Sequence, residues 1–138
     1  MGLVVADSAI RVDPATEAFL AEVMPAIVGT RRQSGAVKLT PVWYEYRAER
    51  FWLNGWRGAR WLDQLLSQGG ASLLFIDPKD MHRVVHVEAE LASATTEGAS
   101  LALDRLSQRY LGRNYRAAVP RTRVIVELDP TEIRSTIG

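Results

Sequence analysis

Glycine and arginine alternate in the segment LNGWRGARWLDQLL, residues 53–66, where an apolar strand-like stretch leads into an amphipathic helix. Gly55 and Gly58 allow the backbone to approach a ligand closely. A helix that begins near residue 58 directs unpaired N–H groups and a partial positive charge toward an anion. Arg57 and Arg60 can each bind a phosphate through two hydrogen bonds. These residues alone support two interpretations equally: a phosphate site, or a strand-to-helix loop with two exposed arginines.

Aromatic residues are concentrated around this segment. Because aromatic side chains dominate the buried area of a small domain, most of them are expected in the core. Side chains alternate along a strand, so some must instead face a groove or a subunit interface. A planar ring system would stack naturally beside the tryptophans of this group. The cluster consists of Trp43, Tyr44, Tyr46, Phe51, Trp52, Trp56 and Trp61.

A run of arginines lies further along the chain, in a stretch without any acidic residue. It comprises Arg105, Arg109, Arg113, Arg116, Arg121 and Arg123. Such a run is usually a solvated face. The alternative is a rim that attracts a polyanionic ligand or tail.

Other kinds of chemistry find little support in the sequence. The chain has no cysteine, which excludes thiolate nucleophiles and sulfur-bound metals. His82 and His86 would lie about 13 Å apart on a strand, too far to chelate one ion, so no metal site is expected. The nucleophile-elbow, P-loop and dinucleotide-binding motifs are absent, and no catalytic residue stands out. An enzyme with this sequence would therefore take its chemistry from a cofactor.

Length and composition are those of an ordinary globular domain. The 138 residues fit one domain, residues 1–138, and a net charge of +1 gives no general attraction to nucleic acid or membranes. The N-terminus lacks the features of a signal peptide, and no apolar stretch is long enough to span a bilayer. A cytoplasmic protein is expected.

The pattern of elements predicts a mainly β protein with packed helices. Hairpin-linked strands favour an antiparallel sheet closed into a barrel, with the helices outside it. Pro41 cannot donate a hydrogen bond to a neighbouring strand, so it predicts a bulge or a sheet edge. Helices are predicted at about 14–24, 58–67 and 97–111, and barrel strands at about 26–33, 36–47, 50–54, 71–77, 82–93 and 121–129.

Three segments together resemble the pyridoxamine 5'-phosphate oxidase-like, FMN-binding split β-barrel superfamily. They are GTRRQSGAVKLTPVWYEY, FWLNGWRGARWLDQLL and ASLLFIDP. The resemblance covers roughly residues 15–95, with a looser fit through the final strand, and is greatest to the branch of F420- or FMN-dependent oxidoreductases. It implies an antiparallel, Greek-key-like split barrel, and a homodimer with cofactor sites in grooves between the two barrels.

The resemblance also implies which residues bind the cofactor. It places the backbone of Thr40, Pro41, Val42 and Trp43 along the flavin or deazaflavin ring. It places Asn54, Trp56, Arg57, Gly58 and Arg60 around the phosphate end. The chain departs from the family at Trp61, where a lysine commonly contacts the phosphate.

These observations favour an oxidoreductase that transfers a hydride between F420 or FMN and a small organic substrate in an intersubunit groove. F420 is slightly preferred, because the arginine run suits its anionic tail. Tyr44, Trp56 and Trp61 would shape the pocket, and Arg31 or Arg32 would meet an acidic ligand group. The alternative is a non-catalytic or degenerate split barrel that binds flavin, haem or a related molecule, or has lost its cofactor. Trp61 favours this alternative.

Overall fold

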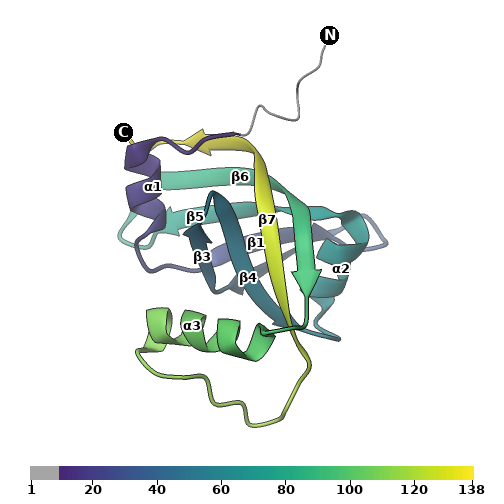
Figure 1. Cartoon of the computed structure of the whole chain (residues 1–138). Coiled ribbons are helices and arrows are strands. Elements are labelled where there is room, and N and C mark those ends of the chain that lie inside the picture. The colour runs from purple at the N-terminus through teal and green to yellow at the C-terminus, as the bar shows by residue number, and fades with distance from the viewer. Residues whose placement is uncertain (1–9) are drawn as a thin grey trace.

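The computed structural model describes residues 10–138, which form one curved antiparallel sheet with three helices around it (Figure 1). The order of the strands across the sheet is β2-β1-β5-β6-β7-β4-β3. This is the split-barrel fold expected from the sequence. The strands are β1 (Ala26–Arg31), β2 (Val37–Val42), β3 (Tyr44–Arg47), β4 (Arg50–Trp56), β5 (Gly70–Asp77), β6 (Asp80–Thr95) and β7 (Arg123–Ser135).

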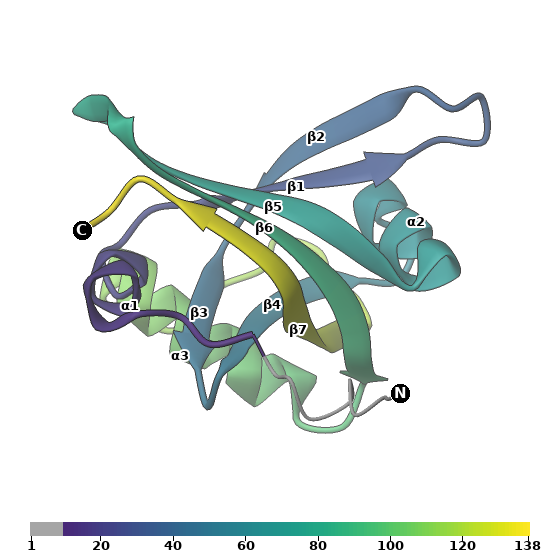
Figure 2. The ribbon, with the colours of Figure 1, turned by 90° about the horizontal axis from the view of Figure 1, so that it is seen from above.

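The two edge strands of the sheet are consecutive in the chain. β2 pairs with β1 and β3 pairs with β4, yet only Trp43 separates them. The sheet must therefore curl until its edges meet at Trp43, which is how an open sheet becomes a half-barrel (Figure 2). The prediction of one continuous strand over 36–47 was wrong, because the chain changes pairing partner at this corner. Pro41 lies on the edge strand β2, as predicted.

The last strand is longer than predicted. β7 continues past residue 129 to Ser135 and stays paired with β6 throughout. Pro130 would ordinarily end such a strand because it has no N–H group. The register shifts beside this proline, because Glu88 pairs with Glu132 and Ala89 pairs with Pro130. Thr131 of β7 is left unpaired as a bulge, which accommodates the proline.

The helices are α1 (Pro14–Leu20), α2 (Arg60–Gln68) and α3 (Ala99–Leu111). Asp13 caps α1 by accepting a hydrogen bond from the N–H of Thr16, at 2.8 Å. α1 ends four residues earlier than predicted because its C-terminal carbonyl groups have partners elsewhere: the Tyr44 hydroxyl and Arg109 both donate to the carbonyl of Leu20. In the described part of the chain, no helix has the length and apolar character needed to cross a membrane.

The core lies inside the curl of the sheet and contains part of the aromatic cluster. Phe51 stacks on Phe75 with ring centroids 5.2 Å apart, and Tyr44 meets Phe75 edge-on at 4.6 Å. Trp52 lies on the opposite face of its strand, beneath the guanidinium of Arg47. As predicted, part of the aromatic cluster lies in the core, and other members lie outside it, where they can line a groove.

Candidate functional site

A groove of about 310 Å³ lies between the β2–β3 corner, β4 and α3. Its size is at the lower end of the range for small-molecule sites. The structure brings seven of the ten predicted cofactor-binding residues into its lining, namely Thr40, Pro41, Val42, Trp43, Asn54, Trp56 and Trp61. The other lining residues are Leu103, Leu106, Tyr115 and Arg123.

The edge strand and the corner that follows it supply one wall of the groove. Trp43 stacks on Tyr110 of α3, with ring centroids 5.1 Å apart, and meets Tyr115 edge-on at 6.2 Å. The Tyr110 hydroxyl also accepts a hydrogen bond from the N–H of Tyr44. These contacts attach α3 to the barrel corner. Figure 1 shows α3 beside β3.

The Trp61 side chain is buried, with 5% of its surface exposed, and lines the groove from within the fold. A Cβ atom on Gly55 would lie 2.8 Å from the indole ring, closer than real contacts allow. Gly55 therefore provides the space that the indole occupies. At the position of the family lysine, this chain has a packed aromatic ring in place of a cation.

Asn54 connects the groove to α3, and both the oxygen and the nitrogen of its side-chain amide form a hydrogen bond within the protein. Its oxygen accepts a hydrogen bond from Nε of Arg123 at 2.9 Å, and its nitrogen donates to the carbonyl of Ala99 at 2.9 Å. Burial lowers the pKa of Arg123, and the nearby charge of Arg121 adds to this effect although Tyr115 opposes it. Arg123 is the cation that the structure brings to the groove.

The other predicted phosphate-binding residues lie outside the groove lining. Arg57 and Arg60 are exposed, and within residues 10–138 their side chains make no hydrogen bond or ion pair. Arg57 lines a separate hollow with Thr95, Thr96 and Val124. Gly58 has a φ of +100°, and α2 begins beside it without a side-chain cap. The glycine turn and uncapped helix start exist as predicted, but they border the groove from outside.

Thr40 offers the groove an unsatisfied polar atom. Its Oγ1 is buried and has no hydrogen-bond partner. Buried polar atoms are usually paired, so an unpaired one beside a hollow is a natural contact for a ligand. A largely apolar groove with aromatic walls and the unpaired hydroxyl of Thr40 fits the planar ring of a flavin or deazaflavin. For the anionic end of such a cofactor, the groove offers only one cation among residues 10–138, Arg123.

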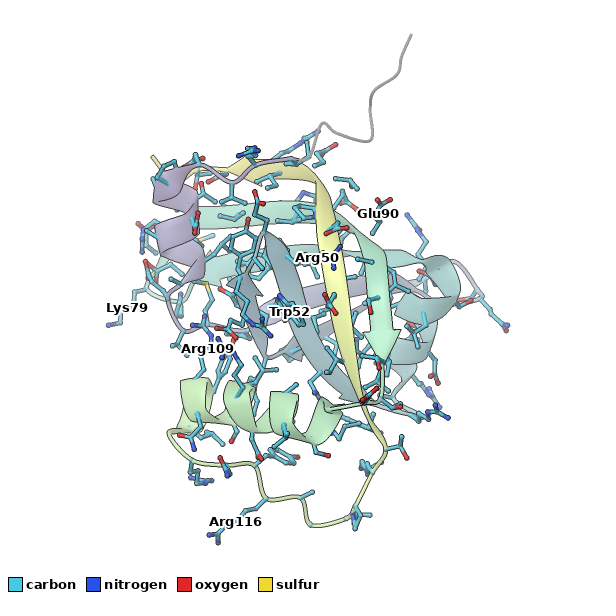
Figure 3. All side chains as sticks on the ribbon, in the orientation of Figure 1. Arg50, Trp52, Lys79, Glu90, Arg109 and Arg116 are labelled. Carbon is cyan, nitrogen blue, oxygen red and sulfur yellow. The ribbon has the colours of Figure 1, made fainter. Side chains whose placement is uncertain are left out.

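The arginines of the run have different binding partners. Arg109 donates to the main-chain carbonyls of Leu20, Ala21, Glu22 and Tyr44, and thereby joins α3 to α1 and β3. Arg105 binds both carboxylate oxygens of Glu45, at 2.6 and 2.9 Å, and this hydrogen bonding lowers the pKa of Glu45. Arg116 extends from the loop after α3 (Figure 3). A continuous polyanion-binding rim is therefore the wrong description of the run.

Sequence reasoning missed four lining residues, Leu103, Leu106, Tyr115 and Arg123. The two leucines share the apolar face of α3, and such a face is typical of core packing. Tyr115 and Arg123 lie at either end of an irregular loop, whose path no local pattern indicates. Only the position of α3 across the barrel corner brings them together with Trp43.

The histidines form no metal site. His86 contacts Glu88, with 2.9 Å between Nε2 and Oε2, and His82 is exposed further along β6. Within residues 10–138, no three His, Asp or Glu side chains are grouped closely enough to hold an ion.

Comparison with known proteins identifies the family of the chain. The model of the pyridoxamine 5'-phosphate oxidase family matches residues 12–137, almost the whole chain. The chain belongs to this family. No curated protein sequence matches it. The resemblance noted from residues 15–95 thus extends through the last strand.

Solved structures agree with this family assignment at the level of the fold. An F420 reductase superposes with a TM-score of 0.79 at 17% identity, over 89% of this chain and 98% of the reductase. A conserved hypothetical protein from Mycobacterium tuberculosis gives 0.71 at 20% identity, over 94% and 86% of the two chains. HupZ from Group A Streptococcus gives 0.64 at 17% identity, over 89% and 92%. This member of the pyridoxamine 5'-phosphate oxidase family therefore shares its architecture with proteins whose names differ widely.

Proposed function

We propose that the chain is a flavin-type oxidoreductase that binds FMN or F420 in the groove beside Trp43 and transfers a hydride to or from a small organic substrate. One observation carries the proposal: seven of the ten predicted cofactor-binding residues, separated by up to 21 positions in the sequence, line the same groove. The family, whose model describes a pyridoxamine 5'-phosphate oxidase, supports redox chemistry.

The bound cofactor would supply the hydride chemistry, while the protein orients it and excludes water. The β2 backbone from Thr40 to Val42 lies along one wall of the groove, and the Thr40 hydroxyl is free to hydrogen bond to a ring. Leu103 and Leu106 cover the groove from α3 and keep water from the reacting face. Arg123 provides positive charge, and its bond to Asn54 holds it in place.

The phosphate end of the cofactor is proposed to lie toward Gly58, Arg57 and Arg60. Their exposed guanidiniums have no protein partner, and the uncapped start of α2 adds a partial positive charge. Because Trp61 replaces the lysine, these contacts must hold the phosphate with one cation fewer.

F420 and FMN both suit the groove, and we retain only a slight preference for F420. The similarity to an F420 reductase, the highest TM-score given above, is in its favour. The arginine run contributes less to this preference than the sequence indicated, because Arg105 and Arg109 are engaged within the protein.

A non-catalytic or degenerate split barrel is the second candidate, and Trp61 favours it. Its ring occupies space at the inner end of the groove, where the family commonly has a lysine. Such a protein would hold a flavin, haem or related molecule without turnover, or hold no cofactor.

Titration with FMN and with F420, followed by cofactor fluorescence, separates the two candidates. The oxidoreductase proposal expects saturable binding of at least one of them, and oxidation of the reduced cofactor by an added organic acceptor. Binding without any turnover supports the non-catalytic candidate. If neither cofactor binds, the oxidoreductase proposal fails.

We also propose that the chain works as a homodimer through the outer face of β2, β1 and β5. Val37 and Leu39 are 55% and 68% exposed on this face. The β1–β2 hairpin that carries them extends beyond the rest of the sheet (Figure 2). Apolar side chains at such positions are typical of an interface.

Charge complementarity supports a second copy as the proposed partner. A row of paired residues crosses this face from Leu39 through Gly29 and Ser72 to acidic Glu88. Arg31 lies on the opposite side of this face from Glu88, where it pairs with Val37. A two-fold axis pairs a surface with itself, so it would bring the basic end of one copy against the acidic end of the other.

A further inference from the structure

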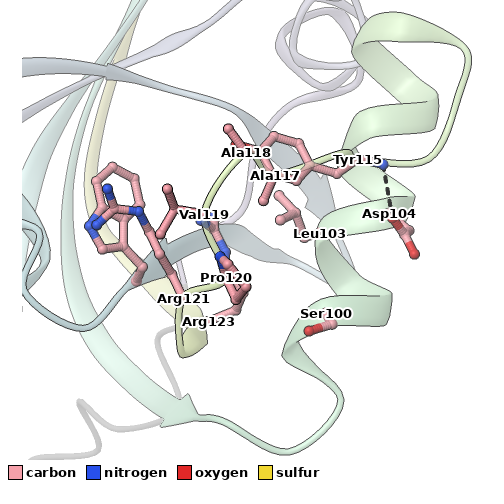
Figure 4. A pocket seen from close by; sticks show the side chains of 11 residues that line it. Ser100, Leu103, Asp104, Tyr115, Ala117, Ala118, Val119, Pro120, Arg121 and Arg123 are labelled. Carbon is pink, nitrogen blue, oxygen red and sulfur yellow. Dashed lines mark hydrogen bonds between the residues drawn. The ribbon is translucent and has the colours of Figure 1, made fainter.

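A second cavity, of about 570 Å³, adjoins the groove and shares Trp56 and Arg123 with its lining. Figure 4 shows this cavity. The loop that joins α3 to β7 covers it, and Leu103 and Tyr115 also line both hollows. Neither the family resemblance nor the sequence motifs assigned a role to this space.

Two guanidinium groups in this cavity share one aromatic ring. The Cζ atom of Arg121 lies 5.0 Å from the centroid of the Trp56 ring, and that of Arg123 lies 5.4 Å from it. Such stacking holds a guanidinium in place while leaving N–H groups free to donate. Only Nε of Arg123 is engaged, by Asn54.

These two arginines have no carboxylate partner in the part of the chain that the structure describes. Arg50, Arg83 and Arg105 all form ion pairs, so pairing is available to arginines elsewhere in this fold. The cavity contains one acid, Asp104, which accepts a hydrogen bond from the N–H of Tyr115 at 2.9 Å. Figure 4 shows Asp104 on the α3 side, across the cavity from Arg121 and Arg123. The arginine side thus carries two positive charges on one aromatic ring, and within residues 10–138 no carboxylate forms an ion pair with either of them.

We propose that this cavity binds a small molecule with a carboxylate end group and an apolar body. The carboxylate binds between Arg121 and Arg123. The body lies against Leu103, Val119 and Pro120, which supply apolar surface in the same cavity. Arginine is suited to this task because its planar group binds carboxylates through two hydrogen bonds.

The site indicates that the substrate of the oxidoreductase is a carboxylate. This inference about the substrate rests on the proposed function. A carboxylate held at Arg123 places the rest of the molecule beside Trp56, on the border with the cofactor groove. Carboxylate binding itself does not need the cofactor, so it can be tested on the protein alone.

The test uses benzoate as the probe and benzamide as its uncharged counterpart of the same shape. Binding is followed by the NMR shift of the Trp56 indole N–H. Benzoate is expected to bind saturably, and at least about tenfold more tightly than benzamide, the ratio equivalent to about 1.4 kcal/mol. Equal affinities for the two probes, or no benzoate binding, would overturn the proposal. This comparison requires no variant.

Two variants of the same loop locate the carboxylate. Arg121→Gln is expected to weaken benzoate binding about tenfold, because one charge-assisted contact is lost. Arg116→Gln is the matched control, since Arg116 is exposed and lies outside the cavity lining, and it should change affinity less than about twofold. Equal affinity of Arg121→Gln and the unaltered protein also refutes the site. Cofactor titration remains a separate measurement: benzoate binding without any cofactor binding refutes the oxidoreductase, and the reverse refutes only the carboxylate site.

Discussion

The indole ring of Trp61 packs against Gly55, at a distance that leaves no space for a Cβ atom on the glycine. The two residues come from the end of β4 and the first turn of α2, so this contact sets how the helix leaves the sheet. It also explains how the chain can lack the family lysine, since an aromatic ring fills the inner end of the groove.

Replacing Trp61 separates its packing role from its position near the cofactor. Trp61→Lys and Trp61→Met should each lower the free energy of unfolding by about 3 kcal/mol, because both remove a large buried ring. If residue 61 borders the phosphate, only Trp61→Lys should bind FMN more tightly than the unaltered protein does. Riboflavin, which lacks the phosphate, should show no such gain. Denaturant unfolding and fluorescence titration provide the two measurements, and a lysine variant without increased FMN affinity would place the phosphate elsewhere.

Arg109 is expected to be a structural residue, although it belongs to the arginine run. Arg109→Met keeps much of the side-chain volume but removes four hydrogen bonds to main-chain carbonyls. Within residues 10–138, the carbonyls of Ala21 and Glu22 are then left without a donor. The expected loss is about 2 kcal/mol of unfolding free energy, measured by urea denaturation. Arg113→Met is the control, because Arg113 is exposed in the loop after α3, and it should change stability by less than about 0.5 kcal/mol. Equal stabilities of the two variants would show that the Arg109 contacts contribute nothing.

The order of helices and strands was predictable because it depends on local patterns. Asp13-Pro14 marks the start of α1, and Gly69, with a φ of +75°, ends α2 one residue beyond the predicted range. The corner at Trp43 was not predictable, since the residues on both sides of it are extended and only their pairing partners differ. The length of β7 was likewise hidden, because a proline usually marks the end of a strand and no local pattern predicts the bulge at Thr131 that follows Pro130.

The groove was predictable only on the side formed by contiguous motifs. Thr40 to Trp43 lie in one segment, and a family pattern identifies such a segment directly. Arg123 is far from them in sequence and reaches the groove only because α3 and its loop fold back over the barrel corner. The hydrogen-bond partners of Arg105 and Arg109 could not be predicted from the sequence either. A run of charged residues has the same pattern whether its side chains face water or bind main-chain carbonyls.

The ion pair between Glu45 and Arg105 should make stability depend on pH. Hydrogen bonding by Arg105 lowers the pKa of Glu45 below its ordinary value of 4.5. A lowered carboxyl pKa in the folded state stabilises the protein above the unfolded-state value, and this contribution is lost as the pH falls through the folded-state value. Glu45→Gln should therefore have a lower Tm than the unaltered protein at about pH 7, and the difference should shrink below about pH 4. A Tm difference that stays constant from neutral to acidic pH would contradict this account of Glu45.

The proposed dimer can be tested at Leu39. An aspartate at this exposed position should cost the isolated chain little, but it would place a charge in the centre of an apolar interface. Leu39→Asp is expected to shift the mass in analytical ultracentrifugation from dimer to monomer. Leu101→Asp is the matched control, because Leu101 is similarly exposed on α3, and it should leave the mass unchanged. A monomeric unaltered protein would refute the dimer outright.

The location of the cofactor ring is the central claim, and filling the groove tests it most directly. Val42→Trp adds a large ring on the edge strand that lines the groove, whereas Met81→Trp adds the same ring at an exposed position on β6, outside the groove. The measurement is the Kd for FMN and F420 from cofactor fluorescence, with Tm used to confirm that both variants are folded. We predict that Val42→Trp weakens binding at least about tenfold and that Met81→Trp changes it less than about twofold. Unchanged cofactor affinity in folded Val42→Trp would contradict the assignment of this groove.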